Sequence, residues 1–193
     1  MRELLFFSNN KNKIIEIKKI FKKANLKLLS LSDVEIKNEP KENGQTFEEN
    51  AKIKSVYGFK KTGIPCFADD SGICIEALNW KPGVRSKRFL NSFKNNEACF
   101  KSIIKNSRKN GKLNAYFKTS ISLSINNNQN IVFNGKVDGI ISKEAKGGFG
   151  FGYDPIFIPQ YYKKTLAELS TREKNKISHR SIAVTKLINF LSN

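Results

Sequence analysis

The sequence predicts a mixed α/β protein in which helices flank a twisted sheet. Strand-like apolar segments alternate with segments of helical spacing, and one long alternating stretch is followed at once by a second. The first pattern favours helices packed on a sheet, and the second favours an antiparallel hairpin. The 193 residues include 15 Phe and are 39% hydrophobic, enough for one core, so we expect a single domain over 1–193.

The first third of the chain predicts two strands and two helices. Residues 3–8 are a short apolar run that ends in polar residues, typical of a buried strand, and 27–31 predict a second strand. Between them, 12–24 carry apolar residues at helical spacing. Thr46-Phe47-Glu48-Glu49 has the form of a capping box, which predicts a helix from 47 to about 60.

The remaining elements are mostly strands. We expect strand pieces over 65–69 and 73–77 with a break at Ser71-Gly72, and a helix over 96–106. Residues 113–125 alternate polar and apolar side chains, which predicts a long half-buried strand whose antiparallel partner is 130–142. A short strand over 156–158 and a final helix capped by Ser178 complete the pattern.

The charge balance is strongly basic, with 35 Lys and Arg against 17 Asp and Glu and a formal net charge of +18. A basic surface attracts polyanions, so a nucleic-acid-binding module is one hypothesis. Most of the basic residues are lysines scattered along the chain, and Asn, Ile and Phe are also abundant, which fits a coding bias. We therefore expect no nucleic-acid polymer as partner.

Several other classes are excluded. No apolar run approaches the 18 or so residues of a membrane span, and Leu4–Phe7 is too short for a signal-peptide core, so we expect a cytoplasmic protein with no membrane partner. Cys66, Cys74 and Cys99 are odd in number and irregularly spaced, which favours buried thiols over disulfides or a zinc site.

Four polar segments are candidates for chemistry. The first follows the first strand and opens the first helix, where backbone N–H groups and the helix dipole favour an anion. Its residues are Ser8, Asn9, Asn10, Lys11, Asn12 and Lys13. They predict a phosphate-binding loop with Lys13 reaching the ligand, although an ordinary polar turn has the same composition.

The second segment is Asp69-Asp70-Ser71-Gly72. Mg²⁺ binds through one or two carboxylates and keeps water and substrate phosphates as its other ligands, so paired Asp residues at a strand end suit it. Neighbours in a strand point to opposite faces, so we expect one Asp to be ligand or base and the other a supporting acceptor. Glu42 is a candidate further carboxylate, and a solvated turn is the alternative.

The third and fourth segments suit a flat ligand. Residues 147–155 alternate Gly with aromatic side chains, which allows close backbone approach and stacking, or core packing instead. Residues 174–180 hold His179, the only His of the chain, beside Arg180. This pair could donate hydrogen bonds to a base edge or phosphate, or lie in a solvated basic turn.

Together these segments resemble the Ham1-like ITP/XTP pyrophosphatase family over nearly the whole chain. Six family motifs occur in order: S-N-N-K-N-K at 8–13, E-N-G-Q-T-F-E-E-N-A at 42–51, D-D-S-G-I at 69–73, P-G-V-R-S-K-R at 82–88, G-F-G-Y-D-P-I-F at 150–157 and E-K-N-K-I-S-H-R at 173–180. Asn9 stands where the family usually has Gly, and Trp80 and Arg85 where smaller residues or Tyr are usual.

The resemblance implies an elongated sheet with two lobes and a central substrate cleft, and a homodimer. It also implies Mg²⁺-dependent hydrolysis of purine nucleoside triphosphates with deaminated bases (dITP/ITP, XTP/dXTP) to the monophosphate and pyrophosphate, which cleanses the nucleotide pool. A related enzyme of modified pyrimidine nucleotides and a catalytically inactive relative are the rival hypotheses within this fold. The 179–180 pair favours the purine enzyme, and the intact Asp pair with Lys13 argues against inactivity.

The resemblance also implies roles for single residues. Asp70 is the general base and a metal ligand, and Glu42 is the second metal contact. The loop 8–13 holds the phosphates, and Ser71 touches the substrate. The residues that surround the base or contact the nucleotide are Phe151, Gly152, Tyr153, Asp154, Lys174, His179 and Arg180. Whether Lys174 meets base or phosphate stays open.

Overall fold

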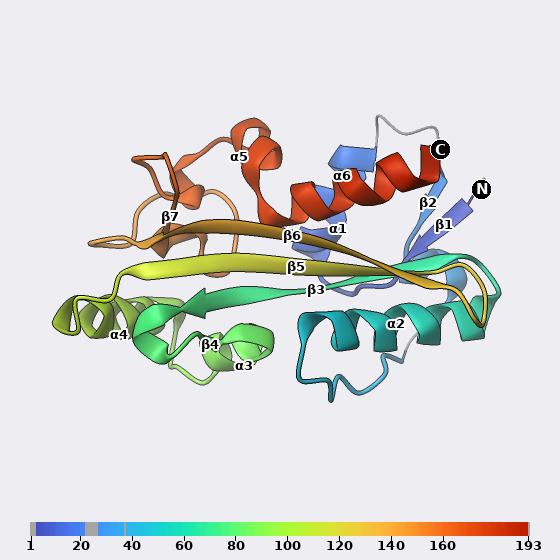
Figure 1. Ribbon diagram of the computed structural model, residues 1–193, viewed down its shortest axis with the longest axis horizontal. Coiled ribbons are helices and arrows are strands. Elements are labelled where there is room, and N and C mark those ends of the chain that lie inside the picture. Colours follow the sequence, from blue (N-terminus) through green and yellow to red (C-terminus); the bar gives the residue numbers. More distant parts are fainter. Residues whose placement is uncertain (1–2, 22–26, 37, 193) are drawn as a thin grey trace. The chain divides into compact units, whose positions relative to one another are not determined.

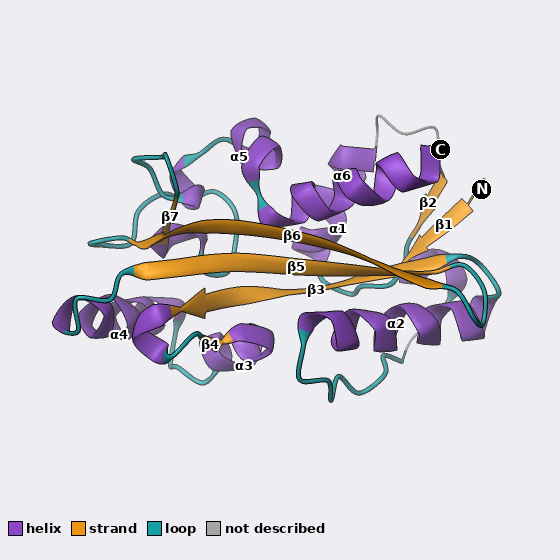
Figure 2. Ribbon diagram, in the orientation of Figure 1, coloured by secondary structure: helices purple, strands orange, loops and turns teal. Residues whose placement is uncertain are grey.

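A computed structural model describes residues 3–21, 27–36 and 38–192. A seven-stranded sheet has the order β2-β1-β3-β5-β6-β7, with β4 paired to β3 (Figures 1 and 2). The strands are β1 (Glu3–Phe6), β2 (Lys27–Leu29), β3 (Cys66–Ile75), β4 (Lys81–Pro82), β5 (Asn114–Ser124), β6 (Asn130–Ile141) and β7 (Phe157–Pro159). The helices are α1 (Lys11–Phe21), α2 (Phe47–Thr62), α3 (Ser86–Asn91), α4 (Asn96–Lys109), α5 (Thr171–Ile177) and α6 (His179–Ser192). This confirms the predicted mixed α/β sheet with flanking helices.

The pairing of the strands is mixed. β1 runs parallel to both β2 and β3, whereas β3 pairs antiparallel with β4 and β6 antiparallel with β7. A turn of five residues separates β5 from its neighbour β6, and strands joined by so short a connection are antiparallel. The predicted hairpin is therefore confirmed. Among the described helices, none is long and apolar enough to cross a membrane.

The chain divides into two compact units. Unit 1 comprises residues 1–70, 119–135 and 180–193, and unit 2 comprises 71–118 and 136–179. The long strands β3, β5 and β6 each contribute residues to both units. The assignment of 1–193 to one domain stays a prediction, as does the central cleft.

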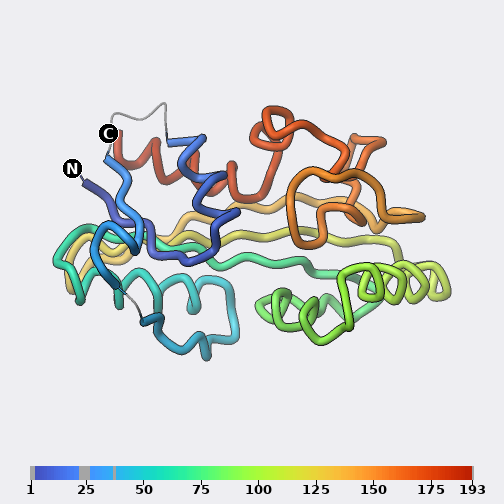
Figure 3. Tube along the Cα trace, turned by 180° about the vertical axis from the view of Figure 1, so that it is seen from behind, coloured from blue at the N-terminus to red at the C-terminus, as the bar shows by residue number. Residues whose placement is uncertain are grey.

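Both faces of the strands in unit 1 are covered by apolar clusters. Leu4 and Phe6 of β1 pack with α1 and α6, which lie side by side over one face (Figures 1 and 3). Leu5 and Phe7 point the other way, into a second cluster to which α2 contributes Tyr57 and Phe59. Burial on both faces explains why the first strand is continuously apolar rather than alternating.

Unit 2 has a separate apolar core. The end of β3 and the start of β5 contribute Ile73, Ile75 and Phe117, and α4 adds buried residues such as Ile103. Phe157 of β7 packs edge-on against Phe117, with ring centroids 4.8 Å apart. This core supports the Gly-rich segment, because Tyr153 and Ile156 are members of it.

One expected element is wrong. Ser71 and Gly72 do not break the strand, because β3 continues from Cys66 to Ile75. A Cβ on Gly72 would lie 2.3 Å from the carbonyl oxygen of Gly83, so this glycine permits close backbone approach within the strand. The helices α3 and α5 were not predicted, and residues 22–24 of the first predicted helix lie outside the described residues.

Candidate active site

The loop after β1 is organised by Asn10. Its Oδ1 accepts hydrogen bonds from the backbone N–H groups of Asn12 (3.1 Å) and Lys13 (3.3 Å), which is the geometry of a helix cap. Ser8 Oγ in turn accepts from the N–H of Asn10 at 3.2 Å. These bonds fix the first turn of α1 and hold Lys13 in it, whereas the side chains of Asn9, Lys11 and Asn12 are exposed.

Asp69 faces α1 and α6. Its Oδ2 lies 3.0 Å from Lys13 Nζ and accepts a hydrogen bond of 3.2 Å from Arg180 Nε. Arg180 is itself fully enclosed and pairs through Nη1 with Glu16 of α1. Burial alone would raise the pKa of Asp69, but the charges of Lys13 and Arg180 outweigh it and hold that pKa well below its usual range. Asp69 is therefore a fixed negative charge that orders two cations.

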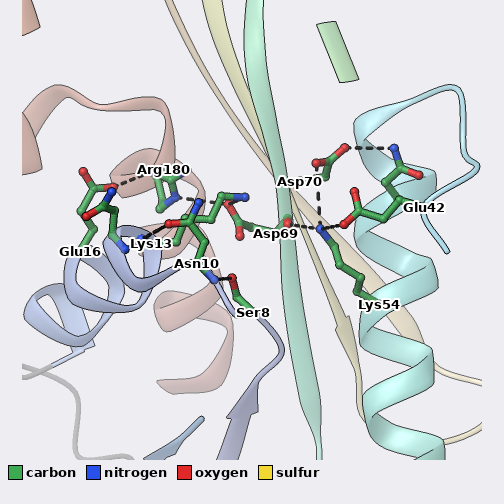
Figure 4. Close-up of polar contacts among 11 residues, drawn as sticks. Ser8, Asn10, Lys13, Glu16, Glu42, Lys54, Asp69, Asp70 and Arg180 are labelled. Atoms are coloured by element: carbon green, nitrogen blue, oxygen red, sulfur yellow. Dashed lines mark hydrogen bonds and ion pairs between the residues drawn. The ribbon is translucent and has the colours of Figure 1, made fainter. Parts of the chain in front are cut away.

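Asp70 faces the opposite side of β3, toward α2 (Figure 4). Asn50 Nδ2 donates to its Oδ2 at 3.2 Å, and Lys54 Nζ lies 4.0 Å from its Oδ1. Burial raises the pKa of Asp70, and the negative charge of Glu42 adds to that effect, while Lys54 opposes it. The adjacent carboxyls thus face opposite sides of the strand (Figure 4), as strand alternation predicts, and their pKa values shift in opposite directions. Their roles as base and supporting acceptor stay predictions.

Lys54 joins the groups around Asp70. Its Nζ donates to the backbone carbonyl of Asp69 at 2.8 Å and pairs with Glu42 Oε1 at 3.2 Å. Burial would lower the pKa of Lys54, but the surrounding carboxylates raise it, so the ammonium stays charged. The lysine therefore holds the acidic loop and the middle of β3 to one point on α2.

The acidic groups of this site suit a hard cation. The carboxylates of Asp70 and Glu42 both lie within 4.0 Å of the Lys54 ammonium, so the two oxygen ligands are held near one point. In the described part of the chain, no group of three or more His, Cys, Asp and Glu side chains could hold a metal. A donor set of two carboxylates is what Mg²⁺ uses when substrate phosphates and water complete its shell, so these residues fit that ion.

Unit 2 holds a different polar centre. Asp154 Oδ2 pairs with Lys174 Nζ at 2.7 Å, and both side chains are about 95% buried. The same carboxylate oxygen accepts from the N–H of Phe151 at 2.8 Å, and the Lys174 ammonium lies 4.9 Å from the centre of the Phe151 ring. Gly150 has φ +80°, and a Cβ there would lie 2.1 Å from Asp154 Oδ2, so only glycine fits.

Two further predicted residues of unit 2 are held by aromatic contacts and backbone bonds. The imidazole of His179 stacks on Phe117, with centroids 4.6 Å apart and planes 8° apart. The hydroxyl of Tyr153 donates to the backbone carbonyl of Ser86 at 2.7 Å, and burial raises its pKa. Tyr153 is therefore anchored in the core, while Gly152 adopts φ +64° beside it.

Comparison with known proteins assigns the family. A family model described as the Ham1 family matches residues 4–190. The chain belongs to the Ham1 family. A dITP/XTP pyrophosphatase of Christiangramia forsetii is 42% identical over 190 residues, covering 98% of this chain and 99% of that protein. One of Flavobacterium psychrophilum is 43% identical over 191 residues, with coverages of 99% and 100%.

A solved structure agrees with this family. The HAM1 protein of Coxiella burnetii superposes with a TM-score of 0.89 at 34% identity, covering 100% of this chain and 99% of that one. The resemblance drawn from the six motifs is therefore confirmed, and so is the fold.

The Ham1 site residues expected from the sequence fall into two groups. Unit 1 brings Lys13, Glu42, Asp70 and Arg180 to the two faces of one strand, and Ser71 follows Asp70 in β3. Unit 2 brings Phe151, Asp154 and Lys174 together. Arg180 contacts Asp69 and Glu16 in unit 1, although its neighbour His179 belongs to unit 2. Its expected contact with a base stays a prediction.

Three residues of the site were missed by sequence reasoning. They are Glu16, Asn50 and Lys54. Lys54 had a usable signal, because it shares a helix face with Phe47, Asn50 and Ala51, and a lysine on the buried face of a helix requires partners. Glu16 gave no such signal in the sequence, because its partner Arg180 lies 164 residues further along the chain.

Proposed function

We propose that this chain hydrolyses nucleoside triphosphates with deaminated purine bases (dITP/ITP and XTP/dXTP) to the monophosphate and pyrophosphate, in a Mg²⁺-dependent reaction that cleanses the nucleotide pool. The observation that carries the proposal is Asp70, a buried carboxyl with a raised pKa beside Lys54 and Glu42. A carboxyl of this kind suits proton abstraction from water near neutral pH. The two relatives are named dITP/XTP pyrophosphatases, which supports dITP and XTP as substrates.

Residues of unit 1 divide the work on the triphosphate. Asp70 takes the proton of the attacking water on its Oδ1 or Oδ2. Lys13 and the capped loop 8–13 bind phosphate oxygens, and Asp69 keeps Lys13 in place. Hydrolysis of a phosphoanhydride needs little covalent chemistry from the protein, so positioning and charge stabilisation supply most of the rate.

Mg²⁺ is the cofactor that we propose for this site, held by Asp70 and Glu42. When bound, it offsets the negative charge that develops on phosphate oxygens. Lys54 then keeps both carboxylates oriented from the side of α2.

Unit 2 provides the groups that we propose for the base. Phe151 offers a ring, Asp154 and Lys174 a buried ion pair, and His179 a stacked imidazole. Hypoxanthine and xanthine carry a 6-oxo acceptor where adenine carries a donor. A site of donors there rejects adenine, because a buried donor would be left unpaired. Ser71 and the segment 151–154 are proposed to contact the nucleotide.

We further propose that the protein acts as a homodimer in the cytoplasm, with one domain over 1–193 and no nucleic-acid polymer as partner. The family resemblance supports the dimer. The scattering of the lysines through helices, loops and turns supports a free nucleotide rather than a polymer as the polyanion.

One assay tests the activity. Purified protein with Mg²⁺ is expected to release pyrophosphate from dITP or XTP far faster than from dATP or dGTP. Orthophosphate as the direct product, or equal rates on all four nucleotides, would contradict the proposal. Tight duplex binding at physiological salt would revive the nucleic-acid hypothesis, because such binding otherwise weakens steeply with salt.

A further inference from the structure

A buried polar cluster links helix α2 to the hairpin of β5 and β6. It consists of Ser55 from α2, Ser122 and Ser124 from β5, and Asn130 from β6, and we call these four residues the polar clamp. All four belong to unit 1. The three serines are 0–1% exposed, so their hydroxyls depend on one another rather than on water.

The polar groups of the polar clamp lie within hydrogen-bonding distance of one another. Ser55 Oγ lies 2.9 Å from Ser122 Oγ and 3.0 Å from Ser124 Oγ. Asn130 Nδ2 lies 2.7 Å from Ser122 Oγ and 2.9 Å from Ser124 Oγ, and its Oδ1 accepts from Ser122 at 3.0 Å. Because Ser55 can also donate to the backbone carbonyl of Lys52 at 3.2 Å, each hydroxyl has an acceptor and a donor in reach.

Helix α2 needs such a device. Apart from Phe47, its buried residues are small or polar: Asn50, Ala51, Lys54, Ser55 and Gly58. Small side chains allow a close approach, and a Cβ on Gly58 would lie 2.5 Å from Cys66 Sγ. Along this buried face they offer little shape to fix how far the helix is turned or shifted, so the directional hydrogen bonds of the polar clamp add to the apolar contacts of Tyr57 and Phe59.

The position of α2 matters to the site because the residue before Ser55 is Lys54. Asn50, one turn earlier, donates to Asp70, and Lys54 contacts Glu42, Asp70 and the carbonyl of Asp69. A small rotation of α2 would move both groups away from the carboxylates they hold.

We propose that the polar clamp is a positioning element for turnover: it fixes α2 on the hairpin so that Asn50 and Lys54 meet the carboxylates of Asp70 and Glu42. Ser55, Ser122, Ser124 and Asn130 are positioning residues, not catalytic ones. The proposal rests on the proposed function for its kinetic test, and a structural readout keeps the two separable.

The hairpin offers a matched control for the polar clamp. Ser120 lies two residues before Ser122 on the same strand, is equally buried, and donates to Asn134 of β6 at 2.6 Å. It therefore makes a Ser–Asn bond across the hairpin like that of Ser122, but this bond leads to β6 and not to α2. Ser122→Ala and Ser120→Ala each remove one buried hydroxyl from β5. Only Ser122→Ala also removes a contact with Ser55 of α2.

The test measures dITP turnover and hydrogen exchange in both variants. Ser122→Ala is expected to lower kcat about tenfold with KM changed less than about twofold, because a displacement of catalytic groups by a fraction of an ångström costs that much. Ser120→Ala is expected to lower kcat by less than about twofold. Amide exchange over 50–58 should accelerate in Ser122→Ala but not in Ser120→Ala. Equal kinetic effects of the two variants, or equal exchange, would overturn the proposal.

A double-mutant cycle separates positioning from general destabilisation. In a Lys54→Met background, Ser122→Ala should reduce kcat by a smaller factor than in the wild type, since one of the groups it positions is gone. The same factor in both backgrounds would refute the role. Should Ser122→Ala not fold, Ser55→Ala takes its place with the same expectations. If the wild-type protein leaves dITP intact, the proposed function fails, and the exchange comparison still decides about the polar clamp.

Discussion

The two units hold buried charges in different ways. In unit 1, Lys13, Lys54 and Arg180 alternate with four carboxylates along both sides of one strand. In unit 2, one pair, Lys174 with Asp154, is enclosed beside a Phe ring and a glycine that leaves no room for a Cβ. A network can give neighbouring carboxyls different pKa values, which suits proton transfer, whereas a single closed pair fixes a shape, which suits recognition.

This contrast predicts that substitutions in unit 1 act on turnover and that substitutions in unit 2 act on substrate choice. The largest effect is expected from Asp70→Asn. Loss of a general base costs about 10²–10⁴ in rate, so kcat for dITP should fall by about 1,000-fold. Circular dichroism should show an unchanged fold, because a neutral amide is easier to bury than a carboxylate. The exposed Asp138→Asn is the control, and a variant at position 70 that keeps a tenth of the activity would refute the base assignment.

Lys54→Met should have the next largest effect. The substitution keeps the length of the side chain and removes the ammonium that contacts Glu42 and Asp70. We expect kcat to fall by about 100-fold, since such loss of preorganised charge is typically worth 10²–10³. Lys52→Met on the exposed face of α2 should be neutral. A change confined to KM would show that Lys54 serves substrate binding alone, against the assignment made here.

In unit 2, Asp154→Asn should alter selectivity more than rate. The buried Lys174 ammonium would lose its counter-charge and Phe151 N–H would keep a weaker acceptor. We expect KM for dITP to rise about tenfold, kcat to change less than about threefold, and the preference over dATP to shrink, since an imperfectly paired buried group costs about 1–3 kcal/mol. Glu144→Gln, which removes an exposed pair with Lys146, is the control. A fall in kcat comparable to that of Lys54→Met would erase the contrast between the units.

For unit 1, the sequence predicted the strands and the direction in which their side chains point better than it predicted the contacts between side chains. Strand alternation alone placed Asp69 and Asp70 on opposite faces, because that is a local property of any extended chain. The partners of those carboxyls were harder to predict, because they are distant in the sequence. Arg180 lies 111 residues from Asp69, and Asn50 lies 20 residues from Asp70. Such pairs follow from how helices pack on the sheet, which no local pattern encodes.

The error at Ser71-Gly72 has the same origin. A Ser-Gly pair favours a turn when only its neighbours are considered, and here the glycine instead makes room for the backbone at Gly83. The polar clamp was likewise invisible as a unit. Ser122 and Ser124 were recognised as the polar half of an alternating strand, which predicts exposure, yet both are buried against α2.

The smallest expected effect compares the two adjacent carboxyls themselves. The pKa of Asp69 is lowered in the folded state, so its ionised form stabilises the fold above the ordinary Asp range near pH 4, and that stabilisation is lost as the pH falls through the lowered value. The pKa of Asp70 is raised, so the folded state binds its proton more tightly, and that contribution is lost as the pH rises through the raised value. Melting temperatures in metal-free buffer between pH 3 and 7 should therefore diverge: Asp70→Asn gains on the wild type as pH rises, and Asp69→Asn loses. Parallel curves for the two variants would mean that the opposing environments on the two faces of β3 do not separate these carboxyls after all.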